Sequence, residues 1–143
     1  MSATVQCDIV SAQTEIFSGE VSCVIALGET GELGIYPRHA PLMTRLEPGP
    51  IRLLMPDGEE VLFFVGGGLL EVMPHLVTVL ADTAVRAADL DEAAATRARD
   101  EAERELAHRT GEMEIAEVEA RLIEALAQLR AIKQLRKKLK SGH

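Results

Sequence analysis

Residues 113–140, MEIAEVEARLIEALAQLRAIKQLRKKLK, form the longest periodic segment of the chain. Its apolar residues recur mostly at steps of three and four, a spacing that places them on one stripe of an α-helix. The stripe consists of Ile115, Val118, Leu122, Ala125, Leu129, Ile132 and Leu139. At about 1.5 Å per residue the predicted helix is roughly 40 Å long. A helix of that length is longer than a small domain needs.

The charges of this segment are segregated along its length. The acidic residues of the first half are Glu114, Glu117, Glu119 and Glu124, and the basic residues of the end are Arg130, Lys133, Arg136, Lys137, Lys138 and Lys140. Acids at the start and bases at the end complement the helix dipole, but that effect fades within one turn, whereas the basic run covers about three turns. The rest of the basic run is better explained by an acidic partner.

Length and composition limit the possible classes of protein. A chain of 143 residues forms one ordinary domain or two small ones, and 47% apolar residues suffice for a core. Aromatic residues make up only 3%, so the core must be aliphatic. Residues 1–88 hold four arginines against eleven acids, a net charge of −7, whereas residues 89–143 carry −1. An acidic body with one basic tip and few aromatic residues argues against nucleic-acid binding.

The two cysteines and the apolar runs bear on the cellular compartment. Cys7 and Cys23 lie in apolar, strand-like surroundings and are interpreted as buried free thiols, with a single disulfide as the alternative. The N-terminal residues lack the charged and apolar regions of a signal peptide. No apolar stretch approaches the ~20 residues of a membrane span. We expect a soluble, cytoplasmic protein that reaches a membrane only through partners.

Residues 4–85 are predicted to form short β-strands. The clearest hairpin signals are Pro56-Asp57-Gly58, between 51–55 and 61–65, and Pro74-His75, between 69–73 and 76–80. Gly66-Gly67-Gly68 indicates a bulge or a backbone that another segment closely approaches. Further strands are expected at 4–10 and 21–27, with a turn at Ser18-Gly19 and a loop that contains Gly28, Gly31 and Gly34. Many short strands with close turns indicate a β-sandwich or small barrel, not a parallel α/β fold.

The pattern becomes helical near Ala88. Asp89 is a good N-cap, and Glu92 follows at the third helical position. A first helix is predicted over about 89–108, a turn follows, and the second helix covers about 113–140. The expected inner face of the first helix is Ala94, Ala98, Ala102 and Leu106. We therefore predict an α+β protein with segregated domains, a β-sandwich over 1–88 and an antiparallel helical hairpin over 89–143.

The expected hairpin has a seam of small side chains. Alanine buries little apolar area, so such a seam stabilises docking far less than a leucine seam would. The hairpin is therefore expected to undock when it meets a better partner.

No catalytic or metal-binding pattern is found. The histidines are isolated from one another and from the cysteines, and no zinc spacing or phosphate-binding loop occurs. His39 lies in a Pro-rich loop, where it either makes a loop hydrogen bond or contacts a partner. The sequence therefore favours a non-catalytic interaction or regulatory module without a cofactor.

Four segments, in order, resemble one family. They are Gly31-Glu-Leu-Gly-Ile-Tyr-Pro-Arg-His-Ala-Pro-Leu42, Gly66-Gly-Gly-Leu-Leu-Glu-Val72, Val77-Thr-Val-Leu-Ala-Asp-Thr-Ala84 and Asp89-Leu-Asp-Glu-Ala93. Together they resemble the epsilon subunit of the bacterial rotary F-type ATP synthase, and the resemblance covers nearly the whole chain. It implies a β-sandwich followed by a helical hairpin, which agrees with the expectation from the residue pattern.

The resemblance also implies partners and roles. The chain is expected in the central stalk of a proton-translocating (or sodium-translocating) complex, with the gamma subunit, the c-ring and the alpha and beta subunits as partners. The complex would place it on the cytoplasmic face of the bacterial cell membrane as a peripheral protein. Glu32 and His39 are expected on the ring side, and Ser11 is a candidate contact with gamma.

In the family the hairpin has two states. Folded on the sandwich it permits ATP hydrolysis, and extended along gamma it blocks rotation. The residues expected to meet an acidic segment of the beta subunit in the extended state are Arg130, Lys133, Arg136, Lys137 and Lys140.

One position departs from the family pattern. Some members bind ATP through Ile/Leu-Asp-x-x-Arg-Ala, and here the run is Leu90-Asp-Glu-Ala-Ala-Ala95. Asp91 is present, but Ala94 replaces the arginine, which removes a charge-assisted partner worth about 1.5–3 kcal/mol to a phosphate. ATP binding is therefore not expected.

The alternative is a stand-alone membrane-surface adaptor with its basic helix end on anionic lipid. Each base would contribute about 1 kcal/mol there. The segment lacks Trp and Phe anchors, and its apolar stripe suits another helix. An enzyme is a third reading, without an identified site.

Overall fold

A computed structural model describes residues 3–12, 14–108 and 111–141. The N-terminal part contains strands β1 Val5–Ser11, β2 Thr14–Val21, β3 Cys23–Gly28, β4 Gly31–Ile35, β5 Leu42–Leu46, β6 Gly49–Leu54, β7 Glu60–Val65, β8 Gly68–Met73, β9 Leu76–Ala81 and β10 Ala84–Arg86. The 3-10 helix η1 Ala87–Asp89 leads to helices α1 Glu92–His108 and α2 Glu112–Ser141. The predicted fold class is confirmed.

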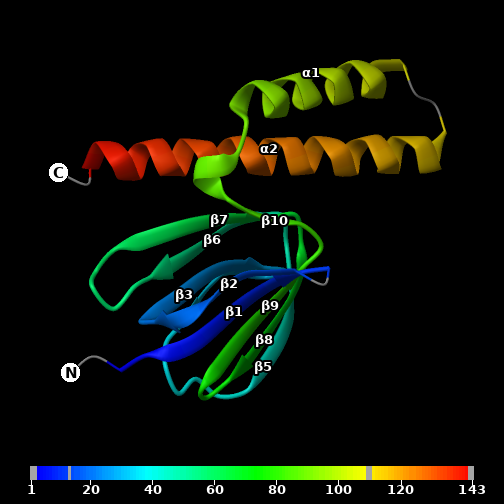
Figure 1. The fold of residues 1–143 in the computed structure, drawn as a ribbon. Helices are drawn as coiled ribbons and strands as arrows, with labels where there is room; N and C mark the ends of the chain where they lie inside the picture. The colour runs from blue at the N-terminus through cyan, green and yellow to red at the C-terminus, as the bar shows by residue number, and fades with distance from the viewer. Residues whose placement is uncertain (1–2, 13, 109–110, 142–143) are drawn as a thin grey trace.

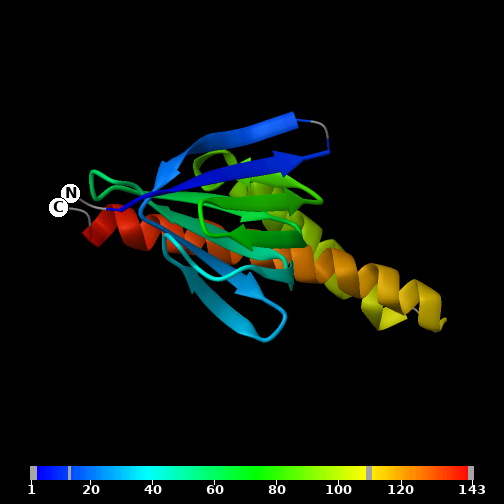
Figure 2. The same cartoon turned by 90° about the horizontal axis from the view of Figure 1, so that it is seen from below.

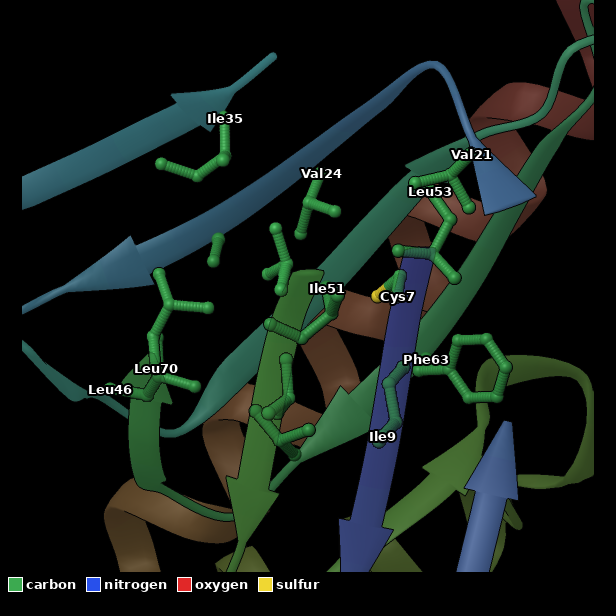
Figure 3. Packing of buried hydrophobic residues seen from close by; sticks show 14 of the residues in the cluster. Cys7, Ile9, Val21, Val24, Ile35, Leu46, Ile51, Leu53, Phe63 and Leu70 are labelled. Carbon is green, nitrogen blue, oxygen red and sulfur yellow. The ribbon is translucent and has the colours of Figure 1, made fainter. Parts of the chain in front are cut away.

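The strands form one sheet that folds over into a sandwich (Figure 1). The strand order is β10-β7-β6-β3-β5-β8-β9-β1-β2, with β4 beside β3. The pairs are antiparallel except for β1 and β9, which run parallel. Alternate residues of β1 point inward, and Val5, Cys7 and Ile9 are buried. Figure 3 shows how aliphatic side chains meet around Ile51 and Leu53, with the ring of Phe63 among them. The core is therefore mainly aliphatic, and the prediction of a wholly aliphatic core is wrong at Phe63.

Both hairpin predictions are confirmed. β6 pairs with β7 around a turn in which Gly58 has a φ of 92°, and β8 pairs with β9 around Pro74-His75. The glycine run is a close backbone approach, because a Cβ on Gly68 would lie 2.2 Å from the Leu80 carbonyl oxygen. Gly68 also has a φ of 145°, which side chains rarely adopt.

Two loop predictions in the first third of the chain are wrong. Ser18 and Gly19 are not a turn, because they lie inside β2 and pair with Asp8 and Cys7. The glycine-punctuated loop is partly β4, which pairs with β3 from Gly28↔Gly31 to Val24↔Ile35. In both cases pairing with a neighbouring strand overrides the local turn preference of glycine.

The first helix begins later than predicted. Asp89 lies in η1 and does not cap the helix. Asp91 does so, because its Oδ1 accepts a hydrogen bond from the backbone N–H of Ala94 at 3.2 Å. An extended Leu90 separates η1 from α1, with φ −71° and ψ 138°. The chain therefore turns twice between the sandwich and the hairpin.

The inner face of α1 also differs from the prediction. Ala95 and Ala102 are buried, whereas Ala94 and Ala98 are exposed. Where two long helices pack side by side, the residues that face the partner recur on average about every 3.5 positions. Residues seven apart therefore all face the partner, whereas residues four apart rotate gradually away from it. The buried residues Val118, Ala125 and Ile132 of α2 follow the same spacing of seven. Leu139, the last member of the predicted stripe, is 62% exposed.

The two helices form layers on one side of the sandwich. Figure 1 shows α2 lying between the sandwich and α1, across the side formed by β6 and β7. In Figures 1 and 2 the first part of α2, with α1 beside it, reaches beyond the strands. α2 therefore has two buried sides, one against α1 and one against the sandwich.

Candidate functional site

The contact between α2 and the sandwich is small. Phe64 of β7, which is 1% exposed, packs with Ala127 and Ala131 of α2, and Val85 and Leu90 are partly buried against this cluster. We call these five residues the docking seam. Burial of the Phe64 ring is worth about 1.5–3 kcal/mol to docking, and the two alanines add little apolar area, so the seam is modest for a helix of this length.

This second buried face of α2 lies outside the stripe that the sequence predicts. Ala127 and Ala131 are four apart and fall between the positions of the predicted stripe. A usable signal is present in residues 61–65, VLFFV, which is a continuous apolar run in an antiparallel hairpin. Because Phe63 and Phe64 point to opposite sides, both faces of β7 had to be covered.

Polar contacts hold α2 at and beyond the docking seam. The Nζ of Lys138 donates to the main-chain oxygen of Glu60, and the guanidinium of Arg136 pairs with the carboxylate of Glu92 at the start of α1. The Nη2 of Arg130 lies 3.5 Å from the Pro48 carbonyl oxygen, which is a long contact. Only the Arg136–Glu92 pair joins two exposed side chains, and such a pair is worth about 0–1 kcal/mol. The contacts of Lys138 and Arg130 go to main-chain oxygens, and that of Lys138 is partly buried.

The predicted basic surface is only partly engaged in this state. Arg130, Lys133, Lys137 and Lys140 are exposed, and spacings of three and four put them on one side of α2. Arg136 differs from them, because it is turned to α1 and paired with Glu92. The docked hairpin thus leaves most of the basic surface open to another molecule.

The three residues predicted on the sandwich do not form one cluster. Ser11 ends β1 and is half-buried beside Thr14 and Ala81. Glu32 is exposed on β4, near the β3–β4 turn. His39 is half-buried beyond the other end of β4, and its Nδ1 lies 2.7 Å from the Ala40 carbonyl oxygen. The loop hydrogen bond proposed for His39 is therefore present.

The loop that carries His39 is tied to another turn. The backbone N–H of Arg38 donates to the Pro74 carbonyl oxygen at 2.9 Å, and Arg38 has a φ of 65°. Positive φ is uncommon outside glycine and persists where the surroundings hold it. The hydrogen bond to the β8–β9 turn is such a restraint, so His39 sits on a positioned loop.

A sheet face with several exposed apolar side chains lies away from the helices, and the strand register places Arg45, Glu71 and Thr78 among them. Alternate residues of β5, β8 and β9 point out of the core, and the largest of them are Met43, Met73 and Leu80, with exposed fractions of 60%, 45% and 46%. Leu69 and Leu76 lie opposite Leu80 and Met73 in the β8–β9 register. We call these five residues the open sheet face. The sequence analysis did not single it out, because exposed and buried apolar residues look alike in a short strand.

Burial suppresses the chemistry of the thiols. Both cysteines are free and buried, as predicted. Burial raises the pKa of Cys7 to about 12, with a smaller contribution from the neighbouring Asp8 carboxylate. Burial also raises the pKa of Cys23. Because the thiolate is the reactive form, neither cysteine suits nucleophilic chemistry near neutral pH.

Among the residues that the structure describes, no group of three or more His, Cys, Asp or Glu side chains is arranged to hold a metal ion. Within the same residues no helix is long and apolar enough to cross a membrane.

Comparison with known families accounts for this arrangement. Residues 4–87 match the model of the ATP synthase Delta/Epsilon chain beta-sandwich domain, and residues 88–133 match that of the Delta/Epsilon chain long alpha-helix domain. The chain belongs to the ATP synthase delta/epsilon chain family.

Its relatives in this family match over almost their full length. An ATP synthase epsilon chain of Nitrosococcus oceani is 58% identical over 139 residues, which cover 97% of this chain and 99% of the relative. One of Stenotrophomonas maltophilia is 56% identical over 138 residues, which cover 96% and 99%. These relatives carry the name of a subunit of the ATP synthase complex.

Solved structures show the same fold at low sequence identity. A chain in the Euglena gracilis mitochondrial ATP synthase structure of OSCP, F1 and c-ring has a TM-score of 0.82 and 20% identity, and the match covers 91% of this chain and 82% of that one. A chain in the Tetrahymena thermophila central stalk and c-ring structure has a TM-score of 0.60 and 13% identity, with 92% and 98% covered.

Two positions of the motif discussed in the sequence analysis have local roles in the structure. Asp91 caps α1, and Ala94 is exposed at the third helical position. The side chain at position 94 therefore points to solvent and is open to substitution.

Proposed function

We propose that this chain is a non-catalytic central-stalk subunit that links gamma to the c-ring of an F-type ATP synthase and restrains ATP hydrolysis through its helical hairpin. The proposal includes the alpha and beta subunits as partners. It places the chain on the cytoplasmic face of the bacterial cell membrane, held there only through the complex, which translocates protons or sodium ions. Membership of the delta/epsilon family supports it, as do the F1, c-ring and central stalk named in the titles of the matching structures.

The sandwich supplies the proposed assembly contacts. Glu32 and His39 face the c-ring in this proposal, each from its own end of β4, and Ser11 faces gamma. The open sheet face adds an apolar surface that helices α1 and α2 leave uncovered (Figure 1). Large exposed apolar surfaces are typical of protein contacts.

The docking seam is the observation that carries the regulatory part. The buried apolar cluster between the 30-residue α2 and the sandwich holds one phenylalanine and two alanines, so we expect release of the helix to cost only a few kcal/mol, about the value of burying one large side chain. Ile123 and Leu126 of α2 are exposed while the hairpin is docked. An extended helix would bury them along a partner, and its exposed basic side would meet the acidic segment expected on beta.

The proposed division into residues 1–88 and 89–143 makes this testable. The sandwich core is built from residues between Val5 and Ala84, with no contribution from the helices. A chain that stops after Ala88 is therefore expected to fold and to join the complex. In this shortened chain the ring of Phe64 would be exposed to solvent. The test therefore also uses the shortened chain with Phe64→Ser, which removes the exposed ring.

The experiment compares complexes that contain the full chain with complexes that contain residues 1–88. We expect both to retain gamma and to pump ions with ATP, and the shorter chain to give the faster ATP hydrolysis. If the shorter chain folds but gamma is lost, the assembly part is wrong. If assembly is intact and hydrolysis is unchanged, the hairpin does not restrain the motor.

A further inference from the structure

A groove lies between the basic end of α2 and the β6–β7 hairpin. Its walls come from two parts of the chain that touch only when the hairpin is docked. Arg52 of β6 and Glu60 and Leu62 of β7 form one wall, and Gln134, Lys137 and Lys138 of α2 form the other. The groove therefore exists only in the docked state.

The lining of this groove is predominantly cationic. Three cations, Arg52, Lys137 and Lys138, face one carboxylate, that of Glu60. The Nε of Arg52 is paired with the Glu60 carboxylate, and Lys138 donates to the main-chain oxygen of Glu60. Docking thus brings Lys137 and Lys138 towards Arg52 and Glu60.

We propose that this groove binds a polyvalent oxyanion, with inorganic phosphate as the simplest case, and that the bound anion holds α2 on the sandwich. The guanidinium of Arg52 carries N–H donors in addition to the one that is paired with Glu60. The Lys137 ammonium has three N–H donors, and the Gln134 amide has two. Charge-assisted hydrogen bonds of this kind suit phosphate oxygens. With Leu62 as the apolar member and no aromatic residue, the lining suits a small anion and not a nucleotide base.

Binding and docking are linked in this proposal. An anion that binds only the docked state lowers the undocked population by the factor 1 + [L]/Kd. At a concentration of about ten times Kd the undocked fraction therefore falls about elevenfold. This inference concerns the isolated chain and does not depend on the proposed place in the central stalk.

The binding test uses the isolated full-length chain at constant ionic strength, with chloride as the comparison anion. Inorganic phosphate is titrated while backbone amide shifts are followed. We expect saturable shifts at β6, β7 and the end of α2, with Kd about tenfold higher in Lys137→Gln, which corresponds to about 1.4 kcal/mol. The matched control is Lys133→Gln, which removes the same charge from an exposed residue that does not line the groove.

The docking test uses Ala131→Cys, because residue 131 is 0% exposed in the docked state. Alkylation of this thiol requires undocking, and the unchanged chain measures any labelling of the buried native cysteines. We expect phosphate at ten times Kd to slow labelling about tenfold, and chloride to have no such effect. Arg52→Gln is the second lining variant, and phosphate is expected to slow labelling less when it is combined with Ala131→Cys.

Three results would each overturn the proposal. The first is amide shifts that do not saturate, or that chloride reproduces. The second is an equal Kd in Lys137→Gln, Lys133→Gln and the unchanged chain. The third is saturable binding that leaves the labelling rate of residue 131 unchanged, since the anion would then bind without stabilising the docked state.

Discussion

The ring of Phe64 on β7 is buried against Ala131 on α2, and this pair lies at the centre of the contact between sandwich and hairpin. Phe64 is 1% exposed and Ala131 is 0% exposed. The two residues are far apart in the sequence, so their contact measures docking of the hairpin and not folding of either part.

A charge placed in this contact is expected to release the hairpin. Ala131→Glu would bury an unpaired carboxylate against Phe64, at a cost of at least about 2 kcal/mol to docking. With the proposed function, release of the hairpin lowers the ATP hydrolysis rate of the assembled complex. The matched control is Ala120→Glu, which adds the same charge at an exposed position of α2. Equal hydrolysis rates for the two variants would contradict the role of the docking seam.

The basic side of α2 is expected to act by charge alone. Lys133→Glu with Lys140→Glu changes two exposed residues and leaves the Arg136–Glu92 pair and the anion groove in place. Exposed ion pairs contribute about 0.2–1 kcal/mol each, so ATP hydrolysis by the complex should rise only a few-fold. High salt should shrink the difference between this variant and the unchanged complex.

The control for this prediction reverses two exposed bases on the other helix, Arg97→Glu with Arg104→Glu. It changes the net charge by the same amount and should leave hydrolysis near the unchanged rate. A similar rise in both variants would mean that net charge, and not the basic side of α2, controls the rate.

ATP is not expected to bind the isolated chain at millimolar or lower concentration. Ala94 supplies no cation at the exposed third position of α1. With inorganic phosphate present to fill the anion groove, titration calorimetry should therefore show no saturable heat from ATP for the unchanged chain. Ala94→Arg is expected to bind ATP more tightly than the control Ala93→Arg, by about tenfold, because the new cation gives phosphate a charge-assisted partner. Micromolar binding to the unchanged chain would refute this prediction.

Stability is expected to fall at alkaline pH through Cys7. Its pKa is about 12 in the folded chain, raised by burial from an ordinary value of 9.0. The unfolded chain therefore loses this proton first, and stability that is fully present below pH 9 is lost as the pH rises towards 12. The expected loss is roughly 1 kcal/mol per pH unit in that window.

The measurement is the free energy of unfolding in denaturant at pH 8 and at a pH about two units higher, for the unchanged chain and Cys7→Ala. Other groups titrate equally in both, so the unchanged chain should show the steeper decline. Parallel declines would show that the Cys7 thiol does not contribute.

The sequence alone determined the local features of this protein. Period-two and period-three-to-four patterns, with Asp57-Gly58 and Pro74-His75 as turns, were enough to predict two hairpins, the aliphatic sandwich and two antiparallel helices. The hairpins and the helices follow from interactions between residues close in the chain, whereas the sandwich was inferred from the number of short strands and needs pairings between distant ones such as β1 and β9. The long basic run of α2 was visible, like the hairpins and the helices, in residues close in the chain.

Tertiary structure decided what depends on distant partners. Ser18-Gly19 became part of a strand because β1 supplied its hydrogen bonds. In the seam of α1, Ala102 is buried as predicted, but Ala95 is buried in place of Ala94 and Ala98 because α2 set the spacing. No pattern in the sequence of α2 predicts the contact of Phe64 with Ala127 and Ala131, since alanine occurs on both exposed and buried faces of helices. Side-chain pattern limits which faces can be buried, and only the packed chain selects which of them is.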